Sequence, residues 1–153
     1  MGSFFGMMSI SSSALTAERE RAEVTAANLA NVETTHTANG GPYVRQEVVF
    51  SATDPAPFGS VLDQMGGPGG PGGPVPGSVH VADVVNDPTP PVMRYEPGSP
   101  DANKKGFVAY PAIDPETEMV DLMDAVRTYQ LNASAIGAAK QMIQESIGIL
   151  KTT

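Results

Sequence analysis

The chain contains no cysteine and only two histidines, His36 and His80. Without cysteine it can form no disulfide, no thiolate metal site and no cysteine nucleophile. Neither histidine has a second ligating residue at a suitable spacing, and the segment "DVVNDP" (83–88) lacks the alternating oxygen ligands and the glycine of a calcium loop. No nucleophile–base motif and no phosphate-binding glycine loop occurs either. We therefore expect a protein that is not an enzyme and needs no metal or cofactor.

Basic residues are also scarce. The 153 residues include nine Lys plus Arg against 17 Asp plus Glu, which gives a formal net charge of −8, and Lys104 and Lys105 are the only adjacent basic pair. Phosphate binding requires a concentrated basic surface, so neither nucleic acid nor an anionic membrane surface is an expected partner. No uncharged apolar run approaches the roughly 20 residues that span a bilayer, so we expect no direct membrane insertion.

Residues 1–17 carry no charged side chain and could be mistaken for a signal peptide. A basic start is missing, however, and the serines at 11–13 interrupt the apolar core that a signal peptide needs. We interpret this segment as the start of a helix. If the protein leaves the cytoplasm, we expect it to do so without a conventional cleaved signal peptide.

Glycine and proline divide the chain into three parts, because neither residue is well tolerated inside a helix. No glycine or proline lies between residues 7 and 39, whereas "GGPGGPGGP" (66–74) lies in the middle. The distribution predicts an N-terminal helix in 1–35, a β-rich region in 36–113 and a C-terminal helix in 114–153. Within the middle region, 56–77 is expected to form a flexible Gly/Pro loop, since the triplet period is too short for collagen.

The C-terminal segment has the strongest helical pattern. Asp114 suits the N-cap, Pro115 suits the first helical position, and Glu116 and Glu118 complement the positive end of the helix dipole. From there spacings of three and four alternate along a seam that is apolar except at Lys140, as in a heptad repeat. The seam consists of Met119, Leu122, Val126, Tyr129, Ala133, Ile136, Lys140, Ile143, Ile147 and Leu150.

The N-terminal segment shows a weaker version of the same repeat. Met8, Leu15, Ala22 and Leu29 recur every seven residues, and Phe5 and Ala26 lie at the complementary positions. Two such helices predict a coiled-coil-like pair inside one domain. Further apolar side chains lie off both seams, however, and would stay in water in a simple pair. We therefore expect additional packing against helices of other subunits.

The middle region reads as strands and turns. "YVRQEVVF" (43–50), "SVHVADVV" (78–85) and "GFVAYP" (106–111) are rich in β-branched or aromatic residues and are bounded by glycine and proline. These segments contain too few apolar residues for a large core of their own. The predicted fold class is thus α+β, with long terminal helices and a small β-rich, Gly/Pro-rich middle.

The stretch "TAANLANVETT" (25–35) places two asparagines near the end of the predicted N-terminal helix. Asn28 and Asn31 weaken a helix, because their side chains compete for backbone hydrogen bonds. One interpretation is that Asn31 helps to end the helix. The other is that one or both asparagines bond to a distant backbone or a neighbouring helix and set the register at the turn into the middle region.

Three segments of the chain resemble a known family. "AANLANVET" (26–34) is similar to a signature of the axial proteins of the bacterial flagellum, which build its rod and hook. "VVNDPTPPVMRYEPGSPDANKKGFVAYPAID" (84–114) and "EMVDLMDAVRTYQLNASAI" (118–136) resemble the basal-body rod proteins within that family. The resemblance covers about residues 1–52 and 78–153, which is the chain without its Gly/Pro-rich insertion.

The resemblance implies a structural subunit of the proximal rod, the tube that links the membrane ring to the distal rod, transmits torque and surrounds the export channel. Its partners would be copies of itself, other rod proteins, membrane-ring and rod-adaptor components and the flagellar type III export apparatus. It would lie in the basal body outside the inner membrane and serve motility. Another rod or hook subunit, or a secreted coiled-coil binding module, are the alternative interpretations.

Together, the seams and the resemblance predict which residues pack helices during assembly. The predicted set is Phe5, Met8, Leu15, Ala22, Ala26, Asn28, Leu29, Asn31, Met119, Leu122, Val126, Tyr129, Asn132, Ala133, Ile136, Ile143, Ile147 and Leu150.

Overall fold

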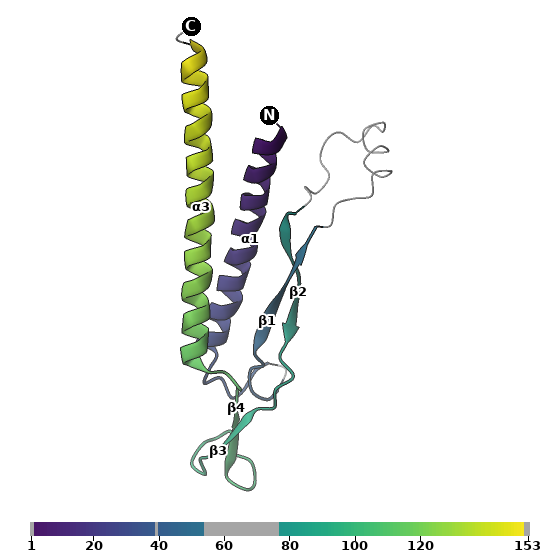
Figure 1. Cartoon of the computed structure of the whole chain (residues 1–153). Helices are drawn as coiled ribbons and strands as arrows, with labels where there is room; N and C mark the ends of the chain where they lie inside the picture. The colour runs from purple at the N-terminus through teal and green to yellow at the C-terminus, as the bar shows by residue number, and fades with distance from the viewer. Residues whose placement is uncertain (1, 39, 54–76, 152–153) are drawn as a thin grey trace, which may run out of the picture. The chain divides into compact units, whose positions relative to one another are not determined.

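A computed structural model describes residues 2–38, 40–53 and 77–151. In chain order its elements are α1 (Gly2–Ala30), β1 (Gln46–Ala52), β2 (Val79–Asn86), β3 (Val92–Tyr95), β4 (Phe107–Tyr110) and α3 (Pro115–Lys151), as Figure 1 shows. In the sequence, two small sheets lie between two long terminal helices, and the two helices contact each other. This arrangement confirms the predicted α+β class. Apart from Gly77, the predicted Gly/Pro loop at 56–77 lies outside the described residues.

Each sheet contains two strands. β1 pairs with β2, and β3 pairs with β4 in an antiparallel register that places Val92 opposite Tyr110 and Tyr95 opposite Phe107. Strands were expected in the segments that became β1, β2 and β4, but β3 was not expected. β3 has only four residues, all of them exposed, and two prolines precede it. Its sequence therefore lacks the alternation of apolar and polar residues that predicts a strand. Its strand conformation depends on β4, which lies further along the chain.

The start of α3 follows the predicted capping chemistry. The backbone N–H of Glu116 and the hydroxyl of Thr117 donate hydrogen bonds to the Asp114 carboxylate, at 3.2 and 2.7 Å. Pro115 is the first residue of the helix, where its missing N–H costs no hydrogen bond. Because the Asp114 side chain accepts from groups two and three residues further on, the cap fixes the point at which the chain turns from β4 into α3.

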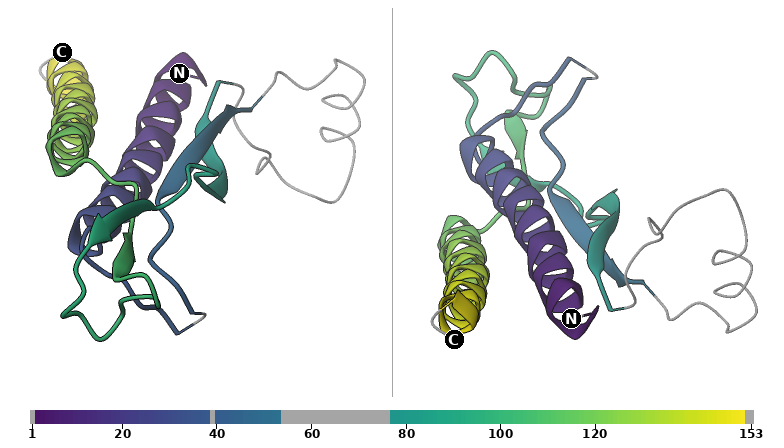
Figure 2. Two further views of the ribbon diagram at one scale, coloured as in Figure 1. Left: turned by 90° about the horizontal axis from the view of Figure 1, so that it is seen from below. Right: turned by 90° about the horizontal axis from the view of Figure 1, so that it is seen from above.

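The chain divides into two compact units. One consists of residues 1–18, 50–82 and 127–153, and the other, which we call the joint unit, of residues 19–49 and 83–126. In the first unit the backbone N–H of Val79 donates to the hydroxyl of Ser13, 3.1 Å away, so the start of β2 is bonded to α1. In the joint unit α1 lies between α3 and the start of β1, an order visible in the two views of Figure 2.

The helix faces that are buried within the chain differ from the predicted seam. On α3 the buried residues Glu118, Ala125 and Ala139 lie on one row, at spacings that are multiples of seven. The predicted row, which begins with Met119 and Val126, is shifted from it by one position in the sequence. Alanines allow close approach of another helix, whereas the larger side chains of the neighbouring row remain outside. The second row of the predicted seam, Leu122, Ile136 and Ile143, is half-buried.

Candidate functional site

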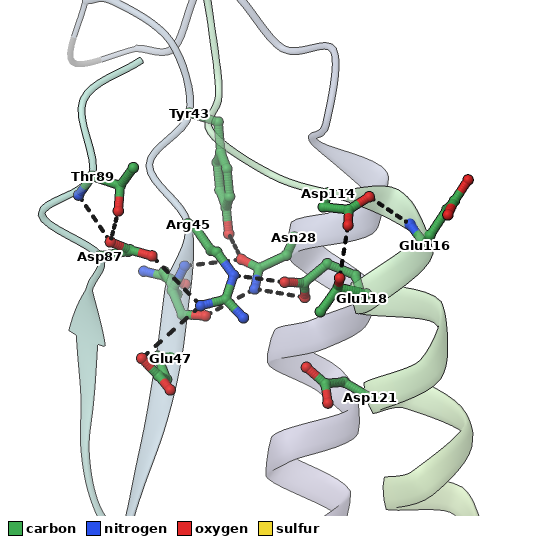
Figure 3. Close-up of polar contacts among 12 residues, drawn as sticks. Asn28, Tyr43, Arg45, Glu47, Asp87, Thr89, Asp114, Glu116, Glu118 and Asp121 are labelled. Atoms are coloured by element: carbon green, nitrogen blue, oxygen red, sulfur yellow. Dashed lines mark hydrogen bonds and ion pairs between the residues drawn. The ribbon is translucent and has the colours of Figure 1, made fainter. Parts of the chain in front are cut away.

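A cluster of buried polar side chains lies in the joint unit, and its centre is Asn28 on α1. The Asn28 amide donates to the carbonyl of Gln46 at 2.8 Å and to the carboxylate of Glu118 at 3.1 Å. Its oxygen accepts from the backbone N–H of Gln46 at 3.0 Å and from the hydroxyl of Tyr43 at 3.1 Å. Figure 3 shows these bonds converging from three segments of the chain. Every hydrogen-bonding position of the amide is therefore used.

Glu118, from the first turns of α3, is the charged member of this cluster. Its side chain is 2% exposed, and Arg45 Nε donates to its Oε1 at 2.6 Å. This hydrogen bond is the main cause that raises the pKa of Arg45 above its ordinary value. A buried carboxylate needs such a partner, since an unpaired charge in this environment is strongly destabilising. Glu118 thus holds α3 to α1 through Asn28 and to the strand region through Arg45.

Arg45 extends the cluster to the end of β2. Its guanidinium lies 3.6 Å from the Asp87 carboxylate, and its backbone carbonyl accepts a 2.8 Å bond from the Asp87 N–H. Hydrogen bonds from the side chain and backbone of Thr89 are the largest causes that lower the pKa of Asp87. Asp87 therefore stays ionised beside Arg45. We name the set Asn28, Tyr43, Arg45, Asp87 and Glu118 the polar joint.

Tyr43 is the remaining member of the polar joint, and its hydroxyl donates to Asn28. Burial raises the pKa of its phenol, and the negative charge of Glu118 raises it further. Both effects favour the neutral phenol, which is the form that donates to Asn28. The polar joint therefore contains one buried acid with a cationic partner and one neutral donor, and all of its bonds are structural. It contains no nucleophile–base pair, and the described residues contain no group of three side chains that could hold a metal ion.

The two asparagines of "TAANLANVETT" have different roles. Asn31 forms local bonds only: its amide donates to the carbonyl of Ala27 at 2.8 Å and its oxygen accepts from Thr34 at 3.1 Å, just past the last residue of α1. This agrees with the interpretation that Asn31 helps to end the helix. Asn28 instead forms long-range bonds to a strand backbone and to the other helix, as the second interpretation expected.

A second polar contact joins the helices in the joint unit. Arg21 on α1 lies 3.6 Å from both the Asp121 and the Asp124 carboxylates on α3. These pairs are more exposed than Arg45–Glu118, so they add less to stability. They also establish that the two helix segments run antiparallel there, because Arg21 precedes Asn28 while its partners follow Glu118.

The predicted packing residues fall into three groups. On α1, Asn28 is buried, Ala26 is exposed, and the half-buried residues are Met8, Leu15, Ala22 and Leu29. Asn31, just past α1, is half-buried, as are Leu122, Asn132, Ile136 and Ile143 on α3. The exposed group on α3 comprises Met119 (53%), Val126 (44%), Tyr129 (41%), Ile147 (50%) and Ala133. The side chains of Phe5 and Leu150 lie outside the described part.

Sequence reasoning missed Tyr43, Arg45, Asp87 and Glu118 as members of the site. Glu118 was interpreted only as a charge near the helix start, and Arg45 only as part of a strand. The available signal was weak: Glu118 occupies a heptad position next to Met119, where a charge can be either solvated or buried and paired. Only the contact with Arg45, which is distant in sequence, distinguishes these cases.

Comparison with known proteins gives a consistent result. Residues 8–35 match the family model described as "Flagella basal body rod protein", and residues 104–149 match "Flagellar basal body rod FlgEFG protein C-terminal". The chain is 34% identical to the flagellar basal-body rod protein FlgC of Borreliella burgdorferi, over 96% of this chain and 97% of that protein. It is 38% identical to that of Bacillus subtilis, over 96% and 98%, and 36% identical to that of Escherichia coli O157:H7, over 90% and 91%. The first matched region contains Asn28, and the second contains Glu118.

Proposed function

Because the chain belongs to the flagellar basal-body rod protein FlgC family, whose members are structural rod subunits and not enzymes, we propose that its terminal helices polymerise into the proximal rod. In this proposal the helices form the tube around the export channel, and the tube links the membrane ring to the distal rod and transmits torque. The subunit reaches the cell-envelope space outside the inner membrane through the flagellar export apparatus. Its neighbours there are copies of itself, other rod proteins and the ring and adaptor components.

The observation that carries the proposal is the exposed apolar row of α3. In the isolated chain Met119, Val126 and Ile147 are about half exposed although they lie on one seven-residue repeat. A monomeric protein gains nothing from such a row, whereas a polymer buries it between subunits at roughly 1.5–3 kcal/mol for each large side chain. No described helix is long and apolar enough to cross a bilayer.

The relatives also favour the rod over the alternatives. They match this chain along nearly all of their length and are themselves rod proteins. A secreted coiled-coil binding module would require unrelated partners, and another axial subunit would match relatives of a different kind. The model that matches residues 104–149 is named for FlgEFG proteins, so the choice among axial subunits rests on the FlgC relatives that match along nearly all of their length.

The test uses point variants, because deleting residues 115–153 would also remove Glu118 and thereby disrupt the polar joint. Met119→Glu and Val126→Glu place a charge on the exposed row without altering any bond of the joint. We expect the variant chain to keep its helical content but to leave cells without complete rods and without motility. Gln130→Glu, an exposed change off this row, is the matched control and should assemble normally.

Complete rods built from a Met119→Glu/Val126→Glu chain would overturn the proposal. Helical content is measured by circular dichroism of the purified protein, rod assembly by electron microscopy of isolated basal bodies, and motility by swimming in soft agar.

A further inference from the structure

The methionines of the described part of the chain are unusually exposed. Methionine is among the residue types that are most often buried, yet five of the six described methionines are exposed and only Met8 is half-buried. The exposed five are Met7 (52%), Met93 (51%), Met119 (53%), Met123 (63%) and Met142 (49%). Because the chain has no cysteine, methionine thioethers are its only sulfur groups and the first side chains that a peroxide would oxidise.

Met119 and Met123 form a pair near the start of α3. They are four residues apart, so on a helix they lie on neighbouring turns of one face. Glu118, directly before Met119, is 1% exposed and bonded to Asn28 and Arg45. The polar joint therefore fixes the backbone at this point without covering the two methionines.

Accessibility of the pair would change on assembly. In the isolated chain water reaches both side chains, and Met123 is the most exposed of the described methionines. In the proposed rod, the row that contains Met119 is buried between subunits. A methionine that packs well there is flexible and apolar, but it remains open to chemical change for as long as the subunit is unassembled.

We propose that Met119 and Met123 are sites of oxidation by hydrogen peroxide in the unassembled subunit, and that their sulfoxides prevent α3 from packing against a neighbouring subunit. The inference rests on the proposed function, because it concerns the regulation of the α3 surface that the rod would bury. It adds to that function a chemical condition on the subunit before it assembles.

The oxidation transfers one oxygen atom to the thioether. The sulfur attacks one peroxide oxygen, an S–O bond forms and the O–O bond breaks. Sulfur gives up two electrons, and the second oxygen leaves as hydroxide and takes the proton of the first, so that water is the other product. Methionine sulfoxide reductases reverse the change, since they remove the oxygen as water while two thiols become a disulfide.

The sulfoxide has nearly the shape of methionine but a different polarity. Its S–O group accepts hydrogen bonds, and in the free chain water supplies the donors. Burial against apolar side chains of another subunit removes this water, and an unpaired polar group in such an environment is unfavourable. Oxidation of a half-exposed methionine should therefore leave the fold of the free subunit unchanged and weaken assembly.

The first test measures accessibility on the purified protein. Hydrogen peroxide is added, and peptides are mapped by mass spectrometry over time, where each sulfoxide adds one oxygen of about 16 Da. We expect Met119 and Met123 to be oxidised before Met8, the internal control, while the far-ultraviolet circular dichroism stays the same. If Met8 gains oxygen as fast as the pair, the inference is wrong.

The second test separates polarity from shape. Neither glutamine nor leucine can be oxidised, but glutamine is polar like the sulfoxide and leucine is apolar like methionine. Met119→Gln/Met123→Gln should lose complete rods and swimming, whereas Met119→Leu/Met123→Leu should keep both. Unchanged thermal melting of the purified variants excludes a folding defect. Normal assembly of the glutamine variant would overturn the inference. Failure of the leucine variant would overturn it too, since the shape of methionine would then be what assembly requires.

The third test uses the oxidant in cells that lack their own copy of this chain. The unaltered chain or Met119→Leu/Met123→Leu is produced with and without sublethal hydrogen peroxide, and complete basal bodies are counted by electron microscopy. Oxidation of other proteins lowers both counts equally, because the strains differ at two residues only. We expect peroxide to lower the count further for the unaltered chain, and equal losses in the two strains would contradict the inference.

Failure of this inference can be distinguished from failure of the proposed function. If Met119→Glu/Val126→Glu blocks rod assembly while Met119→Gln/Met123→Gln assembles normally, the proposed function stands and the oxidation inference falls. If the Met119→Glu/Val126→Glu chain builds complete rods, the proposed function fails and the inference fails with it.

Discussion

The amide of Asn28 donates a 3.1 Å hydrogen bond to the carboxylate of Glu118, 90 residues further along the chain. Each of the two residues is 1% exposed. This bond joins the end of α1 to the beginning of α3. Because both groups are removed from water, replacing either one leaves the other without a full set of partners. The consequences can be measured on the purified protein.

Asn28→Asp should lower the free energy of unfolding by about 2–4 kcal/mol, although the two side chains have nearly the same shape. The substitution removes both donors and brings a second carboxylate against Glu118. Asn132→Asp is the matched control: Asn132 is half-buried on α3 and donates only to the carbonyl of Thr128 in its own helix. Urea unfolding followed by circular dichroism measures both, and equal losses for the two variants would contradict the role of Asn28.

Removing Arg45 should be more costly than removing an exposed arginine. Arg45→Met leaves the Glu118 charge buried and unpaired, and we expect a loss of about 3–5 kcal/mol. Arg19→Met, which breaks an exposed pair with Glu23 on α1, should cost at most about 0.5 kcal/mol.

A double-mutant cycle isolates the Arg45–Glu118 contact. Glu118→Gln alone should also destabilise the protein, but Arg45→Met/Glu118→Gln together should cost clearly less than the sum of the single losses. Additive losses would show that the two side chains do not interact.

The stability of the joint should depend on pH at the alkaline end. The pKa of Tyr43 is raised above its ordinary value of 10.0, so the unfolded chain loses its phenol proton before the folded chain does. This contribution is fully present below pH 10.0 and is lost as the pH rises through the folded-state pKa. Tyr43→Phe should therefore reduce the alkaline loss of stability that begins as the pH rises past 10.0.

Tyr129→Phe, which removes an exposed phenol on α3, is the matched control for this measurement. Tyr110, whose pKa is raised first by its hydrogen bond to Glu96, contributes in the same direction. If Tyr43→Phe and Tyr129→Phe have the same pH profile, Tyr43 is not the group responsible.

Gly106→Ala should destabilise the β3–β4 hairpin by about 1–3 kcal/mol. Gly106 has a φ of +80°, and an added Cβ would meet the Tyr95 ring at 2.9 Å and Pro97 at 3.3 Å. Gly98→Ala is the control, since a Cβ there meets nothing within 4 Å. Near-ultraviolet circular dichroism, which reports the packing of Tyr95, should change for Gly106→Ala only; a normal spectrum would show that the hairpin accommodates the methyl group.

Local sequence rules predicted those parts of the fold that are determined by residues close together in the sequence. The cap at Asp114, the first helical position of Pro115 and the absence of Gly and Pro from residues 7–39 depend on neighbouring residues alone, and the two helices follow them. β3 does not, because its strand conformation depends on pairing with β4. On α3 the row of Glu118, Ala125 and Ala139 is buried within the chain, and a heptad pattern does not indicate which of two adjacent rows faces α1.

The candidate site was predictable only at its centre. Two asparagines near a helix end are unusual enough to identify Asn28 from the sequence, but its partners lie 15, 18 and 90 residues away. Charged residues such as Arg45 and Glu118 are more often solvated than buried, and only their mutual contact reverses this expectation.

The four bonds of Asn28 also impose an order on folding as the chain becomes available from its N-terminus. Its partners at Tyr43 and Gln46 come early, whereas Glu118 comes only in the last part of the chain. Until that part has emerged, Asn28 retains an unused donor and Arg45 lacks its buried counter-ion. An incomplete chain therefore differs chemically from a complete one at this position, because the Asn28 amide and the Arg45 guanidinium gain their buried carboxylate only when α3 is present.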